Sequence, residues 1–457
     1  MTMLWAPQAW LPGGWHEQVL LRIGADGRWV EITPGVATAP AGATRIDGPL
    51  LPGLVNAHSH AFQRAFAGLA ERRESASDDF WSWRDRMYRV ALRIDARQLR
   101  SIAAQLYLEL LQGGYTQVCE FHYLQHDPAG RAYADPLTLS WALADAADVA
   151  GIGLTLLPVL YERAGFTQPA LREDQRRFAS TPASVASAAR AIGASARRNV
   201  NAGVAIHSLR AASPASIAEL RRLAEPIDGP VHIHVAEQTA EVDDCLAATG
   251  ARPIEWLARE GLLDARWHLV HATHTLAGEI DAVARSGAAT VLCPSTEANL
   301  GDGLADLPAW LAAGVPLTLG SDSHATRDWR EELRWLDYGQ RLTLRQRNVC
   351  AAPQSGQPST AQRLFGLVSN SGAAAAGQAR WGLTVGARAD ALVADPQDPT
   401  LLGIPAANTL DALVFSSPGH PWRDVMVAGQ WVIRDGAHAK EKAIAAAFGE
   451  TMARLWQ

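Results

Sequence analysis

Two histidines, His58 and His60, end a short apolar run over residues 52–57. In an extended strand, alternate side chains share a face, so both imidazoles point to the same side. Two imidazoles on one face can bind a single divalent metal ion. The spacing therefore indicates a metal centre, although two polar residues at a strand end explain the pair equally well when it is taken alone.

Three further strand-like runs end in residues that bind metals or carry protons. The first ends in His234 and Glu237, the second in His271 and the third in Asp322. If these runs are parallel strands of one barrel, their carboxyl ends meet at one rim, where barrel enzymes hold their catalytic groups. The two histidines of the first run, with His234 and Asp322, would then form a three-histidine, one-carboxylate site that suits zinc and leaves room for water.

Two residues beside this site fit supporting roles in catalysis. Glu237 follows His234 by three residues, just beyond the strand, where an acid–base group is expected. His271 could hydrogen-bond the activated water. We interpret four further histidines as hydrogen-bonded or structural, although the last two lie near the rim and could contact a substrate: His232, His268, His274 and His324.

The elements that must position these residues alternate between strand-like and helix-like patterns. Eight strand-like segments are found at 51–58, 116–124, 152–161, 201–209, 230–237, 267–274, 288–296 and 316–324. The clearest helical pattern runs from a capping Asp95 to Leu111 and is closed by two glycines. Eight such units over roughly 300 residues predict a (β/α)8 barrel. The alternative, an open doubly wound sheet, would need a Gly-rich phosphate turn after its first strand, which the sequence lacks.

The two ends of the chain have a different pattern. Residues 17–33 and 381–434 contain short strand-like runs separated by glycine turns. Because neither end is long enough to bury its own core, we expect them to combine into one small β-sandwich. The predicted domains are therefore a composite sandwich of residues 1–50 with 378–457, and a barrel of residues 51–377.

Composition restricts the partners of the protein. A formal net charge of −6 supplies no basic surface for nucleic acid. The sequence has no leader-like start and no apolar stretch of about 18 residues, so we expect a cytoplasmic protein without a membrane span. Its four cysteines are widely spaced, which favours reduced thiols. The only lysines are Lys440 and Lys442, which excludes a lysine-bridged two-metal site in the barrel.

The motifs resemble the mononuclear deaminase branch of the amidohydrolase superfamily. That branch has a His-x-His on strand 1, a His-x-x-Glu on strand 5, a His on strand 6 and an Asp on strand 8. The matching residues here are His58, His60, His234, Glu237, His271 and Asp322. The resemblance implies hydrolytic deamination of a small molecule with one divalent metal, most readily Zn2+, and a homodimer.

Within that branch, the chain looks most like the formimidoylglutamate deiminases. The segments that carry this resemblance are residues 56–65, 80–84, 120–123, 207–210 and 293–303. The implied reaction converts N-formimino-L-glutamate to N-formyl-L-glutamate and ammonia in histidine degradation. The resemblance also implies five substrate contacts, namely Gln63, Arg84, Tyr123, His207 and Arg210.

The chemistry of these five residues suits a substrate with two carboxylates. Arg84 and Arg210 can bind carboxylates in a bidentate manner, and the other three add neutral donors. Each has an ordinary alternative: Arg84 a surface salt bridge, Tyr123 a place in the core, and Gln63 a helix start. Two other functions stay open, a deaminase of a purine-like or pterin-like amine and a catalytically silent binding scaffold.

Overall fold

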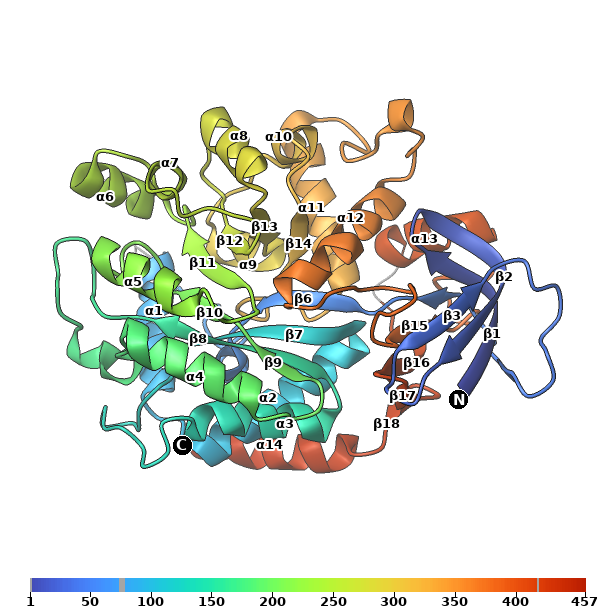
Figure 1. Ribbon diagram of the computed structural model, residues 1–457, viewed down its shortest axis with the longest axis horizontal. Coiled ribbons are helices and arrows are strands. Elements are labelled where there is room, and N and C mark those ends of the chain that lie inside the picture. The colour runs from blue at the N-terminus through green and yellow to red at the C-terminus, as the bar shows by residue number, and fades with distance from the viewer. Residues whose placement is uncertain (1, 74–78, 417–418) are drawn as a thin grey trace.

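Two sheets organise the chain in the computed structural model, which describes residues 2–73, 79–416 and 419–457. One sheet forms a barrel, and the other stands beside it (Figure 1). The expected (β/α)8 barrel with a separate β-structure built from both ends of the chain is confirmed, and the strands expected to form a composite β-sandwich belong to one hydrogen-bonded sheet.

The barrel consists of eight parallel strands, each at a position that the sequence predicts. They are β6 (Leu54–Ser59), β7 (Tyr115–His122), β8 (Gly153–Leu160), β10 (Val204–Ile206), β11 (Val231–Val235), β12 (Trp267–His271), β13 (Ala289–Leu292) and β14 (Leu317–Leu319). Pairing of β10 with β8 closes the ring, and β9 (Val200–Ala202) lies outside it against β8. Every residue of these eight strands is buried, which explains why they appear in the sequence as continuous apolar runs.

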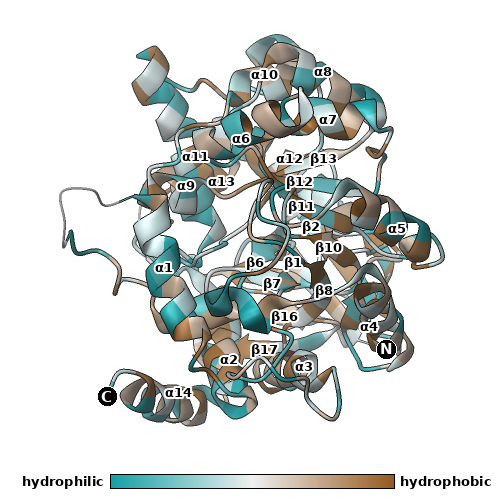
Figure 2. Ribbon diagram, turned by 90° about the vertical axis from the view of Figure 1, so that its left-hand side faces the viewer, coloured by the Kyte–Doolittle hydropathy of each residue, from teal (hydrophilic) through white to brown (hydrophobic). Residues whose placement is uncertain are grey.

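Helices surround the barrel strands (Figure 2). They are α1 (Phe80–Ala91), α2 (Ala96–Gln112), α3 (Thr138–Ala150), α4 (Pro182–Ala194), α5 (Pro214–Ala224), α6 (Thr239–Thr249), α7 (Pro253–Arg259), α8 (Ala277–Ser286), α9 (Pro294–Leu300), α10 (Leu307–Ala312), α11 (Trp329–Leu344) and α12 (Thr360–Ala375). The helix predicted from Asp95 is α2, and Asp95 caps it by accepting a hydrogen bond from the backbone N–H of Gln98. Short 3-10 turns cover Ala61–Ala65 (η1), Glu173–Phe178 (η2), Pro353–Ser355 (η3) and Ala406–Asn408 (η4).

The second sheet draws strands from both ends of the chain. Its strands are β1 (Thr2–Leu11), β2 (Gly14–Ile23), β3 (Trp29–Thr33), β4 (Thr44–Arg45), β5 (Leu50–Leu51), β15 (Ala391–Ala394), β16 (Trp422–Val427), β17 (Gln430–Arg434) and β18 (Ala437–His438). The short strand β5 joins the two halves, because it pairs with β1 on one side and with β15 on the other. Alternate residues of β1 and β2, such as Leu4 and Leu21, enter a hydrophobic core that belongs to this sheet alone.

Several elements differ from the predictions. The predicted strand 288–296 ends at Leu292, because Pro294 starts α9. The sequence patterns also missed β1 and the helices α1, α7, α10, α12, α13 (Thr409–Phe415) and α14 (Glu441–Leu455). The C-terminal helix α14 packs against α2 of the barrel, where Gln112 hydrogen-bonds Glu441, rather than against the sheet. The division into residues 51–377 and the two ends stays a prediction.

Candidate metal centre and substrate pocket

The first and last barrel strands hold two predicted ligand positions in register. The backbone N–H of Asp322 donates to the carbonyl of His58 at 3.0 Å, and the N–H of His60 donates to the carbonyl of Asp322 at 3.4 Å. These bonds continue the parallel pairing of β14 with β6 beyond the end of β14. Asp322 is thereby fixed between the two histidines at the carboxyl ends of the strands.

The four predicted metal ligands converge on one point. Nε2 of His58 lies 3.2 Å from Nε2 of His60, 3.0 Å from Nε2 of His234 and 3.2 Å from Oδ1 of Asp322. Ligand atoms about 2.0–2.1 Å from a zinc ion are about 3.4 Å apart in tetrahedral geometry and about 2.9 Å apart at right angles. The observed distances lie between these values, so the four side chains fit a single divalent metal.

The protonation states of these ligands also suit a metal. Burial lowers the pKa of His58 to about 3, and burial together with the neighbouring histidines lowers that of His234 well below its ordinary value. Burial alone would raise the pKa of Asp322, but the adjacent imidazoles of His58 and His60 hold it well below its usual range. Neutral imidazoles and an ionised carboxylate are the forms that bind cations.

Polar groups behind the ligands hold them in place. Nδ1 of His60 lies 3.0 Å from the carbonyl of Phe121, which fixes the tautomer that leaves Nε2 free. His324 is buried, with Nε2 3.1 Å from the carbonyl of His60 and Nδ1 3.1 Å from the hydroxyl of Ser321. These contacts support the structural role favoured for His324.

The backbone at the site is strained and tightly packed. Asp322 has φ of 42° and His271 has φ of 70°, both in the left-handed region that non-glycine residues rarely adopt. A Cβ added to Gly320 would lie 2.6 Å from Cβ of His58, so only glycine fits beside this ligand. The end of β14 is thus shaped around the site.

Glu237 and His271 lie together beside the four ligands. Nε2 of His271 is 3.7 Å from Oε1 of Glu237 and 3.9 Å from Oδ2 of Asp322. Burial raises the pKa of Glu237 to about 7, against the opposing charge of His271. Burial alone would lower the pKa of His271, but Glu237, Glu297 and Asp322 together raise it to about 10. The pair therefore combines a carboxyl group that can exchange protons near neutral pH with a cationic donor.

Glu297 is a site residue that the sequence analysis did not select. Its Oε1 lies 3.5 Å from Nδ1 of His271 and accepts a hydrogen bond from the backbone N–H of Cys293 at 3.0 Å. It is only 3 % exposed. Glu297 lies within the segment 293–303 that carries the family resemblance. It was not selected because a strand was predicted there, whereas the structure has the helix α9, which directs the carboxylate of Glu297 toward His271.

Two arginines line the pocket above the ligands. Arg84 comes from α1 and Arg210 from the loop after β10, and both guanidinium groups lie over the ring of Trp81, at 4.5 and 5.3 Å from its centroid. Nε of Arg84 is buried and has no hydrogen-bond partner among the described residues. Burial lowers the pKa of Arg84, and the neighbouring Arg210 acts in the same direction. A surface salt bridge was the alternative role for Arg84. Its partner would be Asp85, whose Oδ1 lies 3.8 Å from a terminal nitrogen of Arg84, but the side chain of Asp85 is 63 % exposed.

The three neutral residues line the same pocket. Nε2 of Gln63 donates to the hydroxyl of Tyr123 at 3.1 Å, and its Oε1 is buried without a hydrogen-bond partner among the described residues. The ring of His207 lies 5.7 Å from that of Tyr123 and 5.1 Å from that of His234. The structure therefore brings all five residues of the predicted substrate set to one cavity, next to the four ligands.

The remaining histidines lie outside the pocket. His232 and His268 are fully buried and stack on each other with ring centroids 4.8 Å apart. Nε2 of His232 is 3.0 Å from the carbonyl of Ala375, as expected of a core histidine. The backbone N–H of His274 donates to the carbonyl of Ala236, and its side chain is not among those that line the pocket.

Comparisons with known proteins agree with this geometry. The model of the amidohydrolase family matches residues 50–432, and that of the N-terminal domain of formimidoylglutamate deiminase HutF matches residues 1–44. The formimidoylglutamate deiminase of Pseudomonas aeruginosa is 47% identical over 456 residues, with 100% of each chain covered. A 5-methylthioadenosine/S-adenosylhomocysteine deaminase of Halobacterium salinarum is 28% identical, over 88% of this chain and 85% of its own.

Solved structures show the same fold. The amidohydrolase from Brucella melitensis superposes with a TM-score of 0.94 at 40% identity, and each chain is covered completely. An adenosine deaminase from Xanthomonas campestris with bound zinc superposes with a TM-score of 0.80 at 22% identity, over 100% of this chain and 98% of that one.

Proposed function

The chain belongs to the amidohydrolase family, and from this premise we propose that it hydrolyses N-formimino-L-glutamate to N-formyl-L-glutamate and ammonia, a reaction of histidine degradation. The observation that carries the proposal is the pairing of Arg84 and Arg210 beside a His-His-His-Asp cluster. The substrate carries a formimino group on its α-nitrogen and two carboxylates, one on the α-carbon and one at the end of the side chain. Two partly buried guanidinium groups and a site that could activate water match the carboxylates and the formimino group.

A divalent metal is expected between His58, His60, His234 and Asp322, and we propose that it is zinc. Three imidazoles and one carboxylate are ligands that zinc accepts, and their spacing fits its bond lengths. When bound, such a metal supplies Lewis acidity that lowers the pKa of a water molecule toward about 7.

The side chains around the ligands would carry out the proton transfers. Glu237, with its pKa near neutral, would take a proton from the attacking water and later deliver one to the departing nitrogen. His271 would donate a hydrogen bond from Nε2 to the oxygen that adds to the formimino carbon, and Asp322 would help to orient that oxygen. The new C–O bond replaces the bond to the terminal nitrogen, which leaves as ammonia.

The pocket would orient the substrate through its carboxylates. Arg84 and Arg210 would bind them. Gln63, whose Oε1 has no hydrogen-bond partner among the described residues, would add a neutral contact together with Tyr123 and His207. Because Trp81 covers both arginines, the guanidinium groups are held in place before the substrate arrives.

The decisive experiment measures ammonia release by the purified, metal-analysed protein from N-formimino-L-glutamate and identifies the organic product. Formation of N-formyl-L-glutamate at a rate proportional to the metal content is the expected result. If a fully metallated sample leaves this substrate unchanged but deaminates a heterocyclic amine such as 5-methylthioadenosine, the proposal is wrong and the alternative deaminase function replaces it. A sample without metal or activity would instead point to a silent scaffold.

Location and assembly can be tested separately. No helix among the described residues has the length and apolar character needed to cross a membrane. We keep a cytoplasmic homodimer as a prediction, which cell fractionation and light scattering of the purified protein will check.

A further inference from the structure

A second cavity lies on the far side of the helix that carries Arg84. Residues of α1 at one set of positions, including Arg84 and Tyr88, line the substrate pocket. Residues at the alternate positions, Arg86, Arg89 and Val90, line the second cavity. The helix α1 therefore separates two hollows, of which only the first is used by the proposed reaction.

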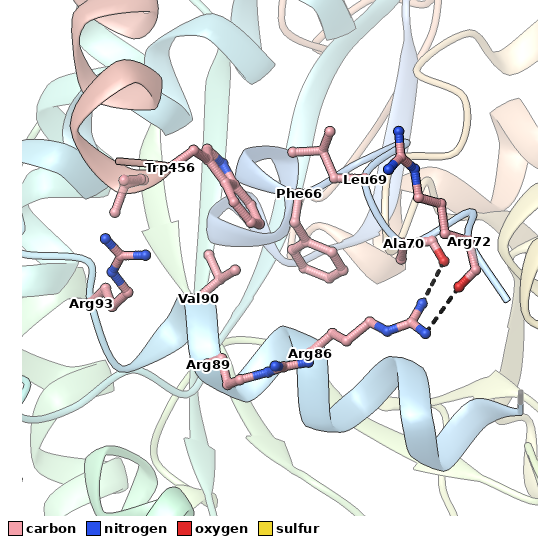
Figure 3. A pocket seen from close by; sticks show the side chains of 10 residues that line it. Phe66, Leu69, Ala70, Arg72, Arg86, Arg89, Val90, Arg93 and Trp456 are labelled. Atoms are coloured by element: carbon pink, nitrogen blue, oxygen red, sulfur yellow. Dashed lines mark hydrogen bonds between the residues drawn. The ribbon is translucent and has the colours of Figure 1, made fainter. Parts of the chain in front are cut away.

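The floor of this cavity is apolar. Phe66 and Val90 form part of it, and both are buried (Figure 3). Trp456, which follows α14 at the C-terminus, reaches over the cavity and donates a hydrogen bond from Nε1 to the carbonyl of Ala65 at 3.1 Å. Leu69 and Trp456 still expose 53% and 48% of their surface. The cavity volume of about 310 Å³ is that of a small-molecule site.

The polar lining of the cavity is cationic. It contains Arg72, Arg86, Arg89 and Arg93, and no acidic residue contributes to it among those that the structure describes. Arg86 is held in place, since its two terminal nitrogens donate to the carbonyls of Ala70 and Arg72 at 2.8 and 3.0 Å (Figure 3). In a protein with a net charge of −6, this grouping does not follow from the overall charge.

Three of these arginines have no carboxylate partner in the part of the chain that the structure describes. Within residues 2–73, 79–416 and 419–457, no acid forms an ion pair with Arg72, Arg89 or Arg93, although other arginines of the chain are paired. The acids next to them in the sequence are engaged elsewhere: Glu71 accepts from Asn299, Asp85 lies near Arg172, and Asp95 caps α2. Among the described residues, the positive charges of Arg72, Arg89 and Arg93 are therefore not neutralised by a carboxylate.

We propose that this cavity is a binding site for a small organic anion whose carboxylate, or a similar oxyanion, meets the arginines while an apolar body covers Phe66, Val90 and Trp456. Guanidinium groups recognise planar oxyanions, and contact with the apolar floor removes the exposed surface of Leu69 and Trp456 from water. A ligand of this kind differs from the substrate, which is polar at both ends.

The test uses 4-bromobenzoate as the probe, because its bromine can be located by anomalous scattering. Crystals of the full-length protein are soaked with the probe, and its affinity is measured by calorimetry for wild type and variants. The expected bromine position is above Phe66 and Val90, and the double variant R89A/R93A should weaken binding about fivefold or more. Both side chains are exposed, so the variant should fold, which its unfolding temperature will check.

Two controls separate this site from the catalytic pocket. R84M removes an arginine of the substrate pocket, and R100A/R259A removes two exposed arginines from other helices. Both should bind the probe within about twofold of wild type. Bromine found only beside Arg84 and Arg210, no bromine in the second cavity at millimolar probe, or equal binding by R89A/R93A and wild type would each overturn the proposal. None of these results depends on turnover of N-formimino-L-glutamate.

Discussion

Replacement of Arg84 by Met tests the proposed recognition of the substrate most directly. The guanidinium group of Arg84 is largely buried and stacked on Trp81, and its Nε is unpartnered among the described residues. Such a cation has been withdrawn from water without gaining a strong ion pair, since its contact with Asp85 is 3.8 Å long. A substrate carboxylate would supply the missing partner.

The size of the effect follows from the bonds that would be lost. Hydrogen bonds to charged groups contribute about 1.5–3 kcal/mol, which corresponds to a loss of about 10- to 150-fold in kcat/KM. Methionine keeps much of the apolar contact with Trp81 and Tyr88, so the cost in stability should be small, on the order of 0.5–1 kcal/mol for the lost cation–π contacts. Activity should therefore fall far more than the unfolding temperature.

The assay compares two substrates and three proteins. Wild type, R84M and the surface control R100M are assayed with N-formimino-L-glutamate and with N-formiminoglycine, which lacks the side-chain carboxylate. If Arg84 holds that carboxylate, R84M should lose much less with the shorter substrate than with the longer one. If both substrates lose equally, Arg84 holds the α-carboxylate instead.

If R84M keeps kcat/KM for N-formimino-L-glutamate within about twofold of wild type, Arg84 does not bind a carboxylate of the substrate. R100M should be indistinguishable from wild type, because Arg100 is exposed on α2 and lines neither pocket. A parallel loss in R100M would mean that the change reflects overall charge rather than recognition.

The other predictions concern the metal and the proton carriers. D322N should lower turnover by more than about a thousandfold and reduce the bound metal, and near-normal activity with full metal content would remove Asp322 from the site. Dialysis against a chelator should abolish activity and zinc should restore it, whereas activity that persists in metal-free protein would contradict the proposed site. Because the pKa of Glu237 is raised to about 7, its basic form is lost as the pH falls, so kcat/KM should drop about tenfold per pH unit below about 7. E237Q should lose about 10²- to 10⁴-fold and show no such slope, and an unchanged acid limb in this variant would assign it to another group. E297Q should lower kcat by weakening the charge that keeps His271 protonated, with KM nearly unchanged and the alkaline limb shifted to lower pH; an unaltered pH profile would leave Glu297 with a purely structural role.

Sequence patterns predicted the barrel well because its strands are buried on both sides. Each strand is a short, largely apolar run, and β6, β11, β12 and β14 contain or are closely followed by polar residues, so both the strand positions and the catalytic rim were visible. The convergence of His58, His60, His234 and Asp322 followed from this regularity. The two-residue spacing of the first pair and the parallel order of the strands were sufficient to predict that they meet.

The features that the sequence patterns missed depend on tertiary contacts. The predicted strand continued past Leu292 to Thr296, but Pro294 starts α9 and turns Glu297 toward His271. The helix α1, which the sequence analysis did not recognise, mixes aromatic residues with Arg84 on its substrate-pocket face and places Arg86 and Arg89 beside Val90 on the face of the second cavity. The left-handed backbone of Asp322 and His271 has no signature in residue type, since aspartate and histidine tolerate it only where the surroundings impose it.

The bridging position of β5 has a consequence for synthesis of the chain on the ribosome. Leu51 pairs with Leu392, so about 340 residues must be added before the N-terminal half of the sheet meets its partner. At about 5–20 residues per second, β5 waits roughly 17–70 s with one edge unpaired. Its length of two residues limits how much backbone is open to a wrong neighbour during that interval. A chain truncated before β15 would keep that edge open permanently, so we expect nascent fragments of this kind to be the aggregation-prone ones.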